Sequence, residues 1–288
     1  MKKALFIFAA ILFGSIFNFG HAYTFLVRYN LMILLFFAFI GIRFDFGIFK
    51  KTHFKILAAN ILLPISLYFV LRNYSTSFAQ IAFLLTIIPT AAATPVIAEM
   101  MHADIKLTTA SLLLTTPVIA LILPFLLPNL LKVGGDISTI DLILPIISVV
   151  FVPLFLSQLI QFFAPIVGTF LSRFSVVNFP LFLLNIVIGC GNASYFIQGN
   201  IDAVGQDLLP IIGLTAVLCV ANFQIGKWLG RHENPLAFEL ALGRKNTMIG
   251  LWIALTYLSP IVALGPIFYI ICHNVYNSWQ MLSMRKAT

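Results

Sequence analysis

Charged residues are scarce in this sequence. They make up 9% of its 288 residues, whereas about a quarter of the residues in an ordinary soluble domain are charged. Hydrophobic residues make up 61%, and the mean hydropathy is +1.05. This composition excludes a soluble globular protein. It indicates an all-α, integral, multi-pass membrane protein whose main partner is the lipid bilayer.

Cysteines and catalytic motifs are sparse as well. Cys190, Cys219 and Cys272 are odd in number, lie inside apolar runs and have no Cys-x-x-Cys spacing, which argues against disulfides and zinc sites. The sequence has no His-Glu-x-x-His, no Gly-x-Ser-x-Gly and no paired aspartates within its apolar runs. We therefore expect no enzymatic activity, no cofactor and no metal centre. An intramembrane enzyme stays open as a minor alternative.

Ten apolar segments follow one another along the chain, and we predict a membrane helix for each. They lie at about 4–20, 29–42, 54–71, 78–99, 107–131, 141–163, 176–197, 207–229, 236–258 and 262–283. The second has only 14 uncharged residues between Arg28 and Arg43, whose side chains are expected to reach the interfaces. Residues 1–22 also fit a cleaved signal peptide, but we favour a retained first helix.

The positively charged residues lie mainly on one side of the membrane if these ten segments are helices that cross it. With a cytoplasmic N-terminus, twelve basic residues fall inside and only Arg28, Arg72 and Lys132 fall outside. The inner set is Lys2, Lys3, Arg43, Lys50, Lys51, Lys55, Lys106, Arg173, Lys227, Arg231, Arg285 and Lys286, and Asp136, Asp141, Asp202 and Asp207 lie outside. This bias predicts cytoplasmic termini, as in a bacterial inner-membrane protein. Because the cations lie in short loops, the net charge of +8 does not indicate a nucleic-acid partner.

Ten helices divide into two sets of five, and an odd number per set inverts the second set relative to the first. We therefore predict a single transporter domain of two inverted repeats, at about 1–135 and 136–288. Such repeats each carry one interrupted helix at the membrane midplane. The fourth segment contains Pro89 and Pro95 with two threonines between them, and prolines break helices. The ninth contains Gly243-Arg-Lys-Asn246, so broken, crossing helices are expected at the same place in both repeats.

Arg244 and Lys245 lie near the middle of the ninth apolar segment. A charge at that depth costs about 2.5 to 3.5 kcal/mol on insertion scales, so these residues indicate an anion or coupling-ion site. The alternative is a structural role, in which both side chains reach one interface or pair with Glu239.

At these positions the sequence resembles the bile acid:sodium symporter family, and the likeness extends through most of the chain. Pro89-Thr-Ala-Ala-Ala-Thr-Pro95 and His102-Ala-Asp104 resemble the family's fourth-helix motif, and Ala241-Leu-Gly-Arg-Lys-Asn246 and Thr256-Tyr-Leu-Ser-Pro260 resemble the ninth. His273-Asn274 resembles a tenth-helix Trp-His-Asn, and Asn60 a third-helix Gln. The resemblance implies ten helices in a panel and a core domain, with transport of organic anions coupled to two sodium ions.

The sodium ligands of the family are altered here. Pro95 occupies the place of a ligating Asn, and Ala241 and Lys245 occupy those of a Glu and a Gln. An ammonium group cannot bind sodium but can replace it, and a desolvated lysine beside another cation is suited to proton exchange. We therefore expect no metal site and a transporter that is sodium-independent or proton-coupled through Lys245. Sodium coupling stays open, with Glu239 as a compensating ligand.

The sequence thus predicts a secondary active transporter of a small organic anion by alternating access. The candidate substrate or coupling site comprises Lys245, Arg244, Asn246, Thr94, Pro95, Asn60, Thr108, Ser111, Thr115, Glu239 and Asn274. Thr108, Ser111 and Thr115 share one helical face, although hydroxyls in membrane helices commonly bond to their own backbone. His273 is expected to pack between helices rather than to carry protons. A channel or a non-transporting sensor is the alternative from another class.

Overall fold

The computed structural model describes residues 2–42, 46–131, 139–200 and 205–287. Of the charged residues used above to orient the chain, Arg43, Lys132, Asp136 and Asp202 lie outside these ranges. The described residues are almost entirely helical and include no strand, which confirms an all-α protein. Among these residues, Thr90 and Lys245 form an isolated antiparallel β-bridge.

The first half of the chain is a series of helices with one interruption. They are α1 (Lys2–Ile16), the 3₁₀ turn η1 (Asn18–Tyr23), α2 (Thr24–Phe39), η2 (Phe46–Ile48), α3 (Lys51–Leu71), α4 (Thr76–Ile87), α5 (Thr94–Met100) and α6 (Ile105–Leu131). The fourth apolar segment of the sequence is therefore split into α4 and α5.

The second half also contains one interrupted helix. It comprises α7 (Thr139–Phe163), α8 (Pro165–Ser172), η3 (Arg173–Val177), α9 (Asn178–Gly199), α11 (Leu208–Leu229), α12 (Pro235–Gly243), α13 (Thr247–Tyr257) and α14 (Pro260–Ala287). The ninth apolar segment is split into α12 and α13. The short helices α8 and η3, which lead into α9, have no counterpart among the predicted segments.

Within the residues that the structure describes, seven helical stretches are long and apolar enough to cross a membrane. They span Phe19–Phe39, Lys51–Leu71, Ile105–Leu130, Ile140–Phe163, Pro165–Gly199, Leu208–Leu229 and Pro260–Met284, and Leu5–Ile16, Thr76–Ile87 and Thr247–Tyr257 are shorter apolar helices. Large apolar side chains are widely exposed on them, for example Phe162, Ile166 and Leu209, each more than three-quarters exposed. A surface of this kind is stable against lipid and not against water, so the protein is an integral multi-pass membrane protein.

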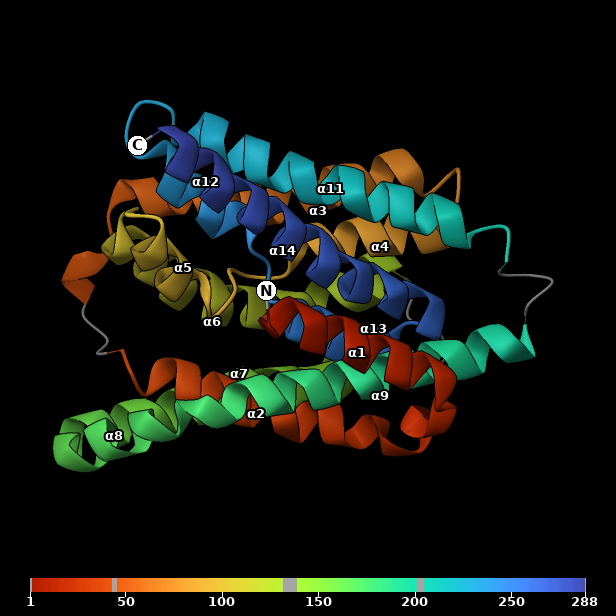
Figure 1. Cartoon of the computed structure of the whole chain (residues 1–288), viewed down its shortest axis with the longest axis horizontal. Coiled ribbons are helices and arrows are strands. Elements are labelled where there is room, and N and C mark those ends of the chain that lie inside the picture. Colours follow the sequence, from red (N-terminus) through yellow and green to blue (C-terminus); the bar gives the residue numbers. More distant parts are fainter. Residues whose placement is uncertain (1, 43–45, 132–138, 201–204, 288) are drawn as a thin grey trace.

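The helices form two groups that run alongside each other (Figure 1). One contains α2, α7, α8 and α9, and the other contains α3, α4, α11, α12 and α14. Contacts of α6 with α7, of α13 with α2, and of α14 with α9 join the two groups. The interrupted helices α4/α5 and α12/α13 are held within the second group by α3, α6, α11 and α14.

Proline explains one of the two interruptions. The helix stops at Ile87, and Pro89 lies in the extended stretch that follows. Pro95 does not break a helix, because it occupies the first turn of α5, where no backbone donor is needed. The second interruption, Arg244–Asn246, contains no proline. Its backbone is instead bonded to the first interruption, as described below.

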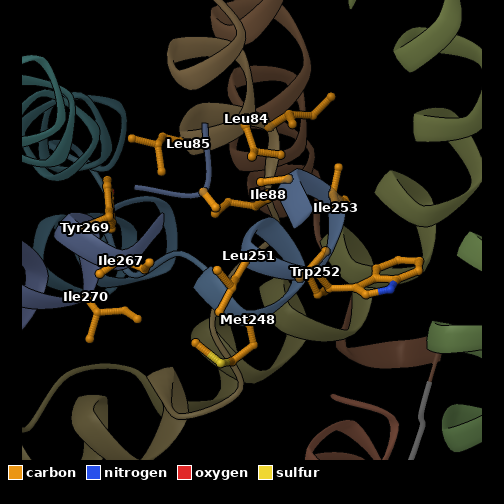
Figure 2. Close-up of a cluster of buried hydrophobic side chains, with 14 of the residues drawn as sticks. Leu84, Leu85, Ile88, Met248, Leu251, Trp252, Ile253, Ile267, Tyr269 and Ile270 are labelled. Carbon is orange, nitrogen blue, oxygen red and sulfur yellow. The ribbon is translucent and has the colours of Figure 1, made fainter. Parts of the chain in front are cut away.

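A buried apolar cluster packs α13 between α4 and α14 (Figure 2). Leu251 and Trp252 of α13, Leu84 and Leu85 of α4, and Ile267 of α14 are members, and each is at most 3% exposed. The cluster lies next to both interruptions, since Ile88 and Met248 belong to it. Apolar packing therefore fixes the ends of the broken helices.

The second helix differs from its prediction. It begins at Thr24, so Arg28 lies within the helix rather than at its boundary. A guanidinium nitrogen of Arg28 donates a hydrogen bond of 2.9 Å to the Ser148 hydroxyl on α7. Arg28 therefore has a hydrogen-bond partner on the neighbouring helix.

Alanine substitutions at two glycines of α11 are expected to change the stability of the protein in opposite directions. A Cβ added at Gly226 would lie 2.5 Å from the Phe238 carbonyl oxygen of α12, whereas at Gly213 it would meet nothing within 4 Å. Gly226→Ala is expected to destabilise the protein by about 1 to 3 kcal/mol through overpacking. Gly213→Ala, the matched control, is expected to stabilise it by about 0.5 to 1 kcal/mol. Thermal unfolding in detergent measures both, and equal effects would refute this close helix contact.

Candidate functional site

The two interruptions cross and bind each other through their backbones. The Ala91 N–H donates to the Arg244 carbonyl and the Asn246 N–H donates to the Pro89 carbonyl, each at 2.8 Å. Backbone groups in an unwound stretch at membrane depth need partners within the protein. The antiparallel pairing of residues 89–91 with 244–246 supplies them.

Side chains on neighbouring helices fix the crossing in place. The Thr90 hydroxyl donates to the Ala241 carbonyl of α12 at 2.8 Å, and the Thr90 N–H donates to the Thr115 hydroxyl of α6 at 3.2 Å. Thr115, one of the predicted site residues, therefore contacts the crossing through Thr90. Thr90 and Thr115 are both fully buried. Each of these hydrogen bonds therefore takes the place of one that the polar group would make to water in the unfolded chain.

Lys245 extends from the crossing toward α3 and α4. Its side chain is 1% exposed, and its ammonium group donates to the Asn60 amide oxygen of α3 and, at 2.7 Å, to the Thr86 carbonyl of α4. Thr86 lies in the last turn of α4, where helix carbonyls lack internal partners and favour a positive charge. Neutral oxygen atoms thus enclose this cation.

Arg244 extends to the other side of the crossing. Its residue is 6% exposed, and its guanidinium lies near Tyr269 and His273 of α14 and near Cys219 of α11. Its Nε has no hydrogen-bond partner. Two adjacent residues therefore place two buried cations on different faces of the crossing.

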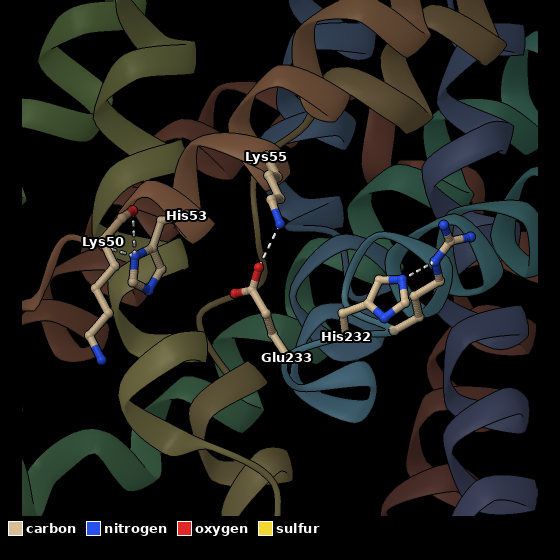
Figure 3. Close-up of polar contacts among 6 residues, drawn as sticks. Lys50, His53, Lys55, His232 and Glu233 are labelled. Atoms are coloured by element: carbon tan, nitrogen blue, oxygen red, sulfur yellow. Dashed lines mark hydrogen bonds and ion pairs between the residues drawn. The ribbon is translucent and has the colours of Figure 1, made fainter.

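No acidic side chain compensates these two charges within the described ranges. The one ion pair among those residues joins Lys55 of α3 to Glu233 of the loop before α12, at 2.5 Å (Figure 3). It lies at the surface, where both side chains are more than a third exposed. A buried cation without a counter-ion is costly to the fold, which indicates that another property of the site retains it.

The Lys55–Glu233 pair predicts a small effect on stability that depends on pH. The hydrogen bond from Lys55 holds the pKa of Glu233 below its ordinary value of 4.5. The stabilisation is therefore present above that value and is lost as the pH falls through the lowered pKa. Glu233→Gln is expected to cost no more than about 1 kcal/mol at neutral pH and nothing in strong acid. Thermal unfolding at both pH values checks this; a large loss at neutral pH would contradict it.

Thr94, Pro95 and Asn246 lie at the starts of the two helices that leave the crossing. Thr94 and Pro95 open α5, and the Thr94 hydroxyl is fully buried without a partner. Asn246 precedes α13, is 7% exposed, and its side chain does not cap that helix. Thr94 and Asn246 thus place polar side chains at the crossing.

Three predicted site residues bond to their own helices instead. The Thr108 hydroxyl donates to the Ile105 carbonyl at 3.0 Å, and Ser111 donates to Leu107 at 2.8 Å. The Asn274 amide donates to the Ile270 carbonyl at 2.7 Å. The structure does not bring these three polar groups into contact with Lys245 or Arg244.

Glu239 lies on α12, between the loop that carries Glu233 and the crossing. Its residue is 4% exposed, and its carboxylate accepts a hydrogen bond of 2.8 Å from the Tyr276 hydroxyl of α14. It forms no ion pair with Arg244 or Lys245. The structure therefore does not show the alternative in which these cations pair with Glu239.

Several polar residues near the crossing escape prediction from sequence. The Tyr269 hydroxyl donates to the Gly243 carbonyl at 2.8 Å and accepts from the Asn222 amide at 3.1 Å. The spacing of Tyr269, His273 and Tyr276 places them on one face of α14 and could have revealed them. The Thr86 carbonyl has no sequence signal, because its role depends on where α4 ends.

The space beside the crossing is closed on the side of α7. An apolar cavity of about 10 Å³ lies there, between Pro89, Trp252 of α13 and Val149 of α7. It holds about one water molecule at most. The two helix groups are thus in contact next to the crossing.

No protein-family model matches this chain, and no curated protein matches it. Function is therefore inferred from the site itself.

Proposed function

We propose that this protein is a secondary active transporter of a small organic anion, working by alternating access and similar in plan to bile acid:sodium symporters. One observation carries the proposal. Two interrupted helices cross inside the protein, and the crossing holds two buried cations that have no acidic partner in the described part of the chain. Unwound backbone at membrane depth is characteristic of transporter substrate sites.

The order of helices supports two inverted repeats. A long helix, an interrupted helix and a long helix follow one another as α3, α4/α5 and α6, and again as α11, α12/α13 and α14. Two helices precede each set, namely α1 and α2, then α7 and α9. Counting each interrupted helix once, and leaving out the short helix α8, gives ten helices among the described elements. Five passages per repeat would orient the repeats oppositely, with the crossing at their centre.

Lys245 supports transport without sodium. Its ammonium is bound by an amide oxygen and a backbone carbonyl, which are the kinds of ligand that a sodium ion takes. A sodium ion about 4 Å from this charge would be repelled by about 4 kcal/mol at an effective dielectric of 20. In this proposal Lys245 permanently fills the role of a coupling cation and holds α3, α4 and the crossing together.

The helix termini support an anionic substrate. The N-terminus of α13 directs the positive end of its helix dipole toward the crossing, where Asn246 and the unpaired Thr94 hydroxyl add hydrogen-bonding capacity. Arg244 and Lys245 add positive potential. The small apolar cavity between Trp252 and α7 marks where the two helix groups would separate to admit the substrate.

Flux into liposomes tests this proposal. Purified protein would be reconstituted, and uptake of radiolabelled taurocholate and naphthalenesulfonate would be compared with uptake of octanoate and benzoate, in sodium and in choline buffer. A carrier gives saturable uptake and counterflow that do not depend on sodium. Flux without saturation or counterflow would indicate a channel, and flux that requires sodium would remove the role assigned to Lys245. No flux of any anion would overturn the proposal.

A further inference from the structure

Polar residues, all buried except the half-buried Tyr276, form a stripe along α14. Tyr269, His273, Tyr276, Asn277 and Gln280 recur at helical spacing on this helix, which packs against α11. Two of them, Tyr269 and Tyr276, bond to α12. We call this set the α14 seam. It begins at the crossing, where Tyr269 bonds to the Gly243 carbonyl, and ends beside the last turn of α11. The seam therefore joins the crossing to the membrane face that carries the α11–α12 loop.

Glu239 is the acidic group of this region. Its carboxylate accepts the Tyr276 hydrogen bond, and Gln224 of α11 donates to the same tyrosine oxygen at 2.7 Å. The Gln280 side chain also interacts with the carboxylate. Neutral donors alone hold this nearly buried carboxylate, with no ion pair in the described part of the chain. A carboxyl group in such a setting can exist in either protonation state.

Unsatisfied polar atoms continue from Glu239 toward the crossing. Gln280 Oε1, Asn277 Oδ1, His273 Nδ1 and Arg244 Nε are all buried and have no hydrogen-bond partner in the protein. Buried polar atoms in native proteins are nearly always paired with protein or with ordered water. Four such atoms along one interface mark places where ordered water would complete the hydrogen bonds.

Few charged groups act on the Glu239 carboxylate. From α11, Lys227 interacts with it electrostatically, and from α14 its titratable neighbour is Tyr276. The other helices that pack against α12 carry titratable groups at their ends: Lys51, His53 and Lys55 on α3, Glu99 on α5 and Lys106 on α6. Arg244 follows on the same polypeptide, five residues or about 7.5 Å along a helix axis. Glu239 thus lies between one surface cation and the two cations of the crossing.

We propose that Glu239 binds and releases the proton that couples anion transport to a proton gradient. The proton enters along the membrane face near Lys227, adds to the carboxylate to give the neutral acid, and leaves by the same bond. Protonation changes the summed charge of Glu239, Arg244 and Lys245 from +1 to +2, so proton binding and anion binding favour each other. Anion and proton then move in the same direction. This inference rests on the proposed anion transport, and it places the proton on Glu239 rather than on Lys245.

Infrared difference spectroscopy tests the proton site without any substrate. Spectra of the purified protein at mildly acidic and mildly alkaline pH should differ by the carbonyl band of a protonated carboxylic acid. That band is expected to vanish in Glu239→Gln and to shift in Tyr276→Phe, which removes its hydrogen-bond donor. Glu99→Gln, which changes an exposed carboxylate on α5, should leave the band unchanged. A spectrum of Glu239→Gln identical to that of the wild type would overturn the proposal.

Anion binding gives the second readout. The affinity for taurocholate, or for whichever anion of the flux panel is transported, should rise on the order of tenfold at acidic pH, the effect of removing a negative charge about 12 Å from the anion at an effective dielectric of 20. Glu239→Gln should bind equally well at both pH values, at the affinity of the acidic wild type. Persistent pH dependence in this variant would overturn the inference but leave the carrier intact. A Glu239 band without binding of any anion would overturn the carrier and leave the proton site.

Discussion

Lys245→Gln is expected to lower the affinity for the transported anion by at least about tenfold. A unit charge about 8 Å from an anion contributes about 2 kcal/mol at an effective dielectric of 20, and 1.4 kcal/mol is a factor of ten. The glutamine amide can still donate a hydrogen bond to Asn60 or to the Thr86 carbonyl, so the crossing should persist. Equilibrium binding of the anion to purified protein measures the effect.

The matched control is Lys106→Gln, at an exposed lysine in the first turn of α6. It removes the same charge at the protein surface, where solvent and salt screen it, and should leave affinity unchanged. If Lys245→Gln binds the anion as well as the wild type does, the ammonium has only a structural role. If both variants lose affinity equally, the effect reflects net charge rather than the crossing.

Asn60→Asp is expected to abolish transport while leaving the protein folded and at least as stable as the wild type. The substitution is nearly isosteric and gives the Lys245 ammonium a carboxylate partner in place of an amide oxygen. The buried pair gains Coulomb attraction, and the positive potential that attracts an anion disappears. Uptake into liposomes and thermal unfolding would be measured on the same preparation.

Combining Asn60→Asp with Lys245→Gln isolates the interaction. The double variant leaves a buried carboxylate without a cation and should be less stable than Asn60→Asp alone by about 3 to 5 kcal/mol. Loss of stability in Asn60→Asp itself, with transport retained, would show that residue 60 does not set the charge of the site. That result would contradict the role of Lys245 as a built-in cation.

The positions of the two interruptions could be predicted from sequence. Pro89 removes a backbone hydrogen-bond donor and disfavours the helix before it. Two adjacent cations in an apolar segment indicate that this part of the segment does not face lipid. The general class also followed, because composition alone excludes a soluble protein. The burial of Asn60 and Lys245 was also predictable, because polar and charged side chains inside apolar segments avoid lipid. The contact between these two residues was not predictable.

The directions of the side chains could not be predicted. Arg244 and Lys245 are adjacent, but in an extended stretch successive side chains point to opposite sides, so one reaches α14 and the other reaches α3. Thr108, Ser111 and Thr115 share a helical face, yet only Thr115 lies opposite the crossing. Such differences depend on where neighbouring helices end, and residue spacing does not specify that.

Thermal stability of the purified protein across a panel of organic anions, in sodium and in choline buffer, tests the central claim most directly. A ligand that binds the folded state raises stability by RT ln(1 + [L]/Kd), so binding is detected whichever anion of the panel is the substrate. We expect at least one anion to stabilise the wild type equally in both buffers and to lose this effect in Lys245→Gln. Stabilisation that appears only in sodium would contradict the account, because Lys245 would then not replace a sodium ion.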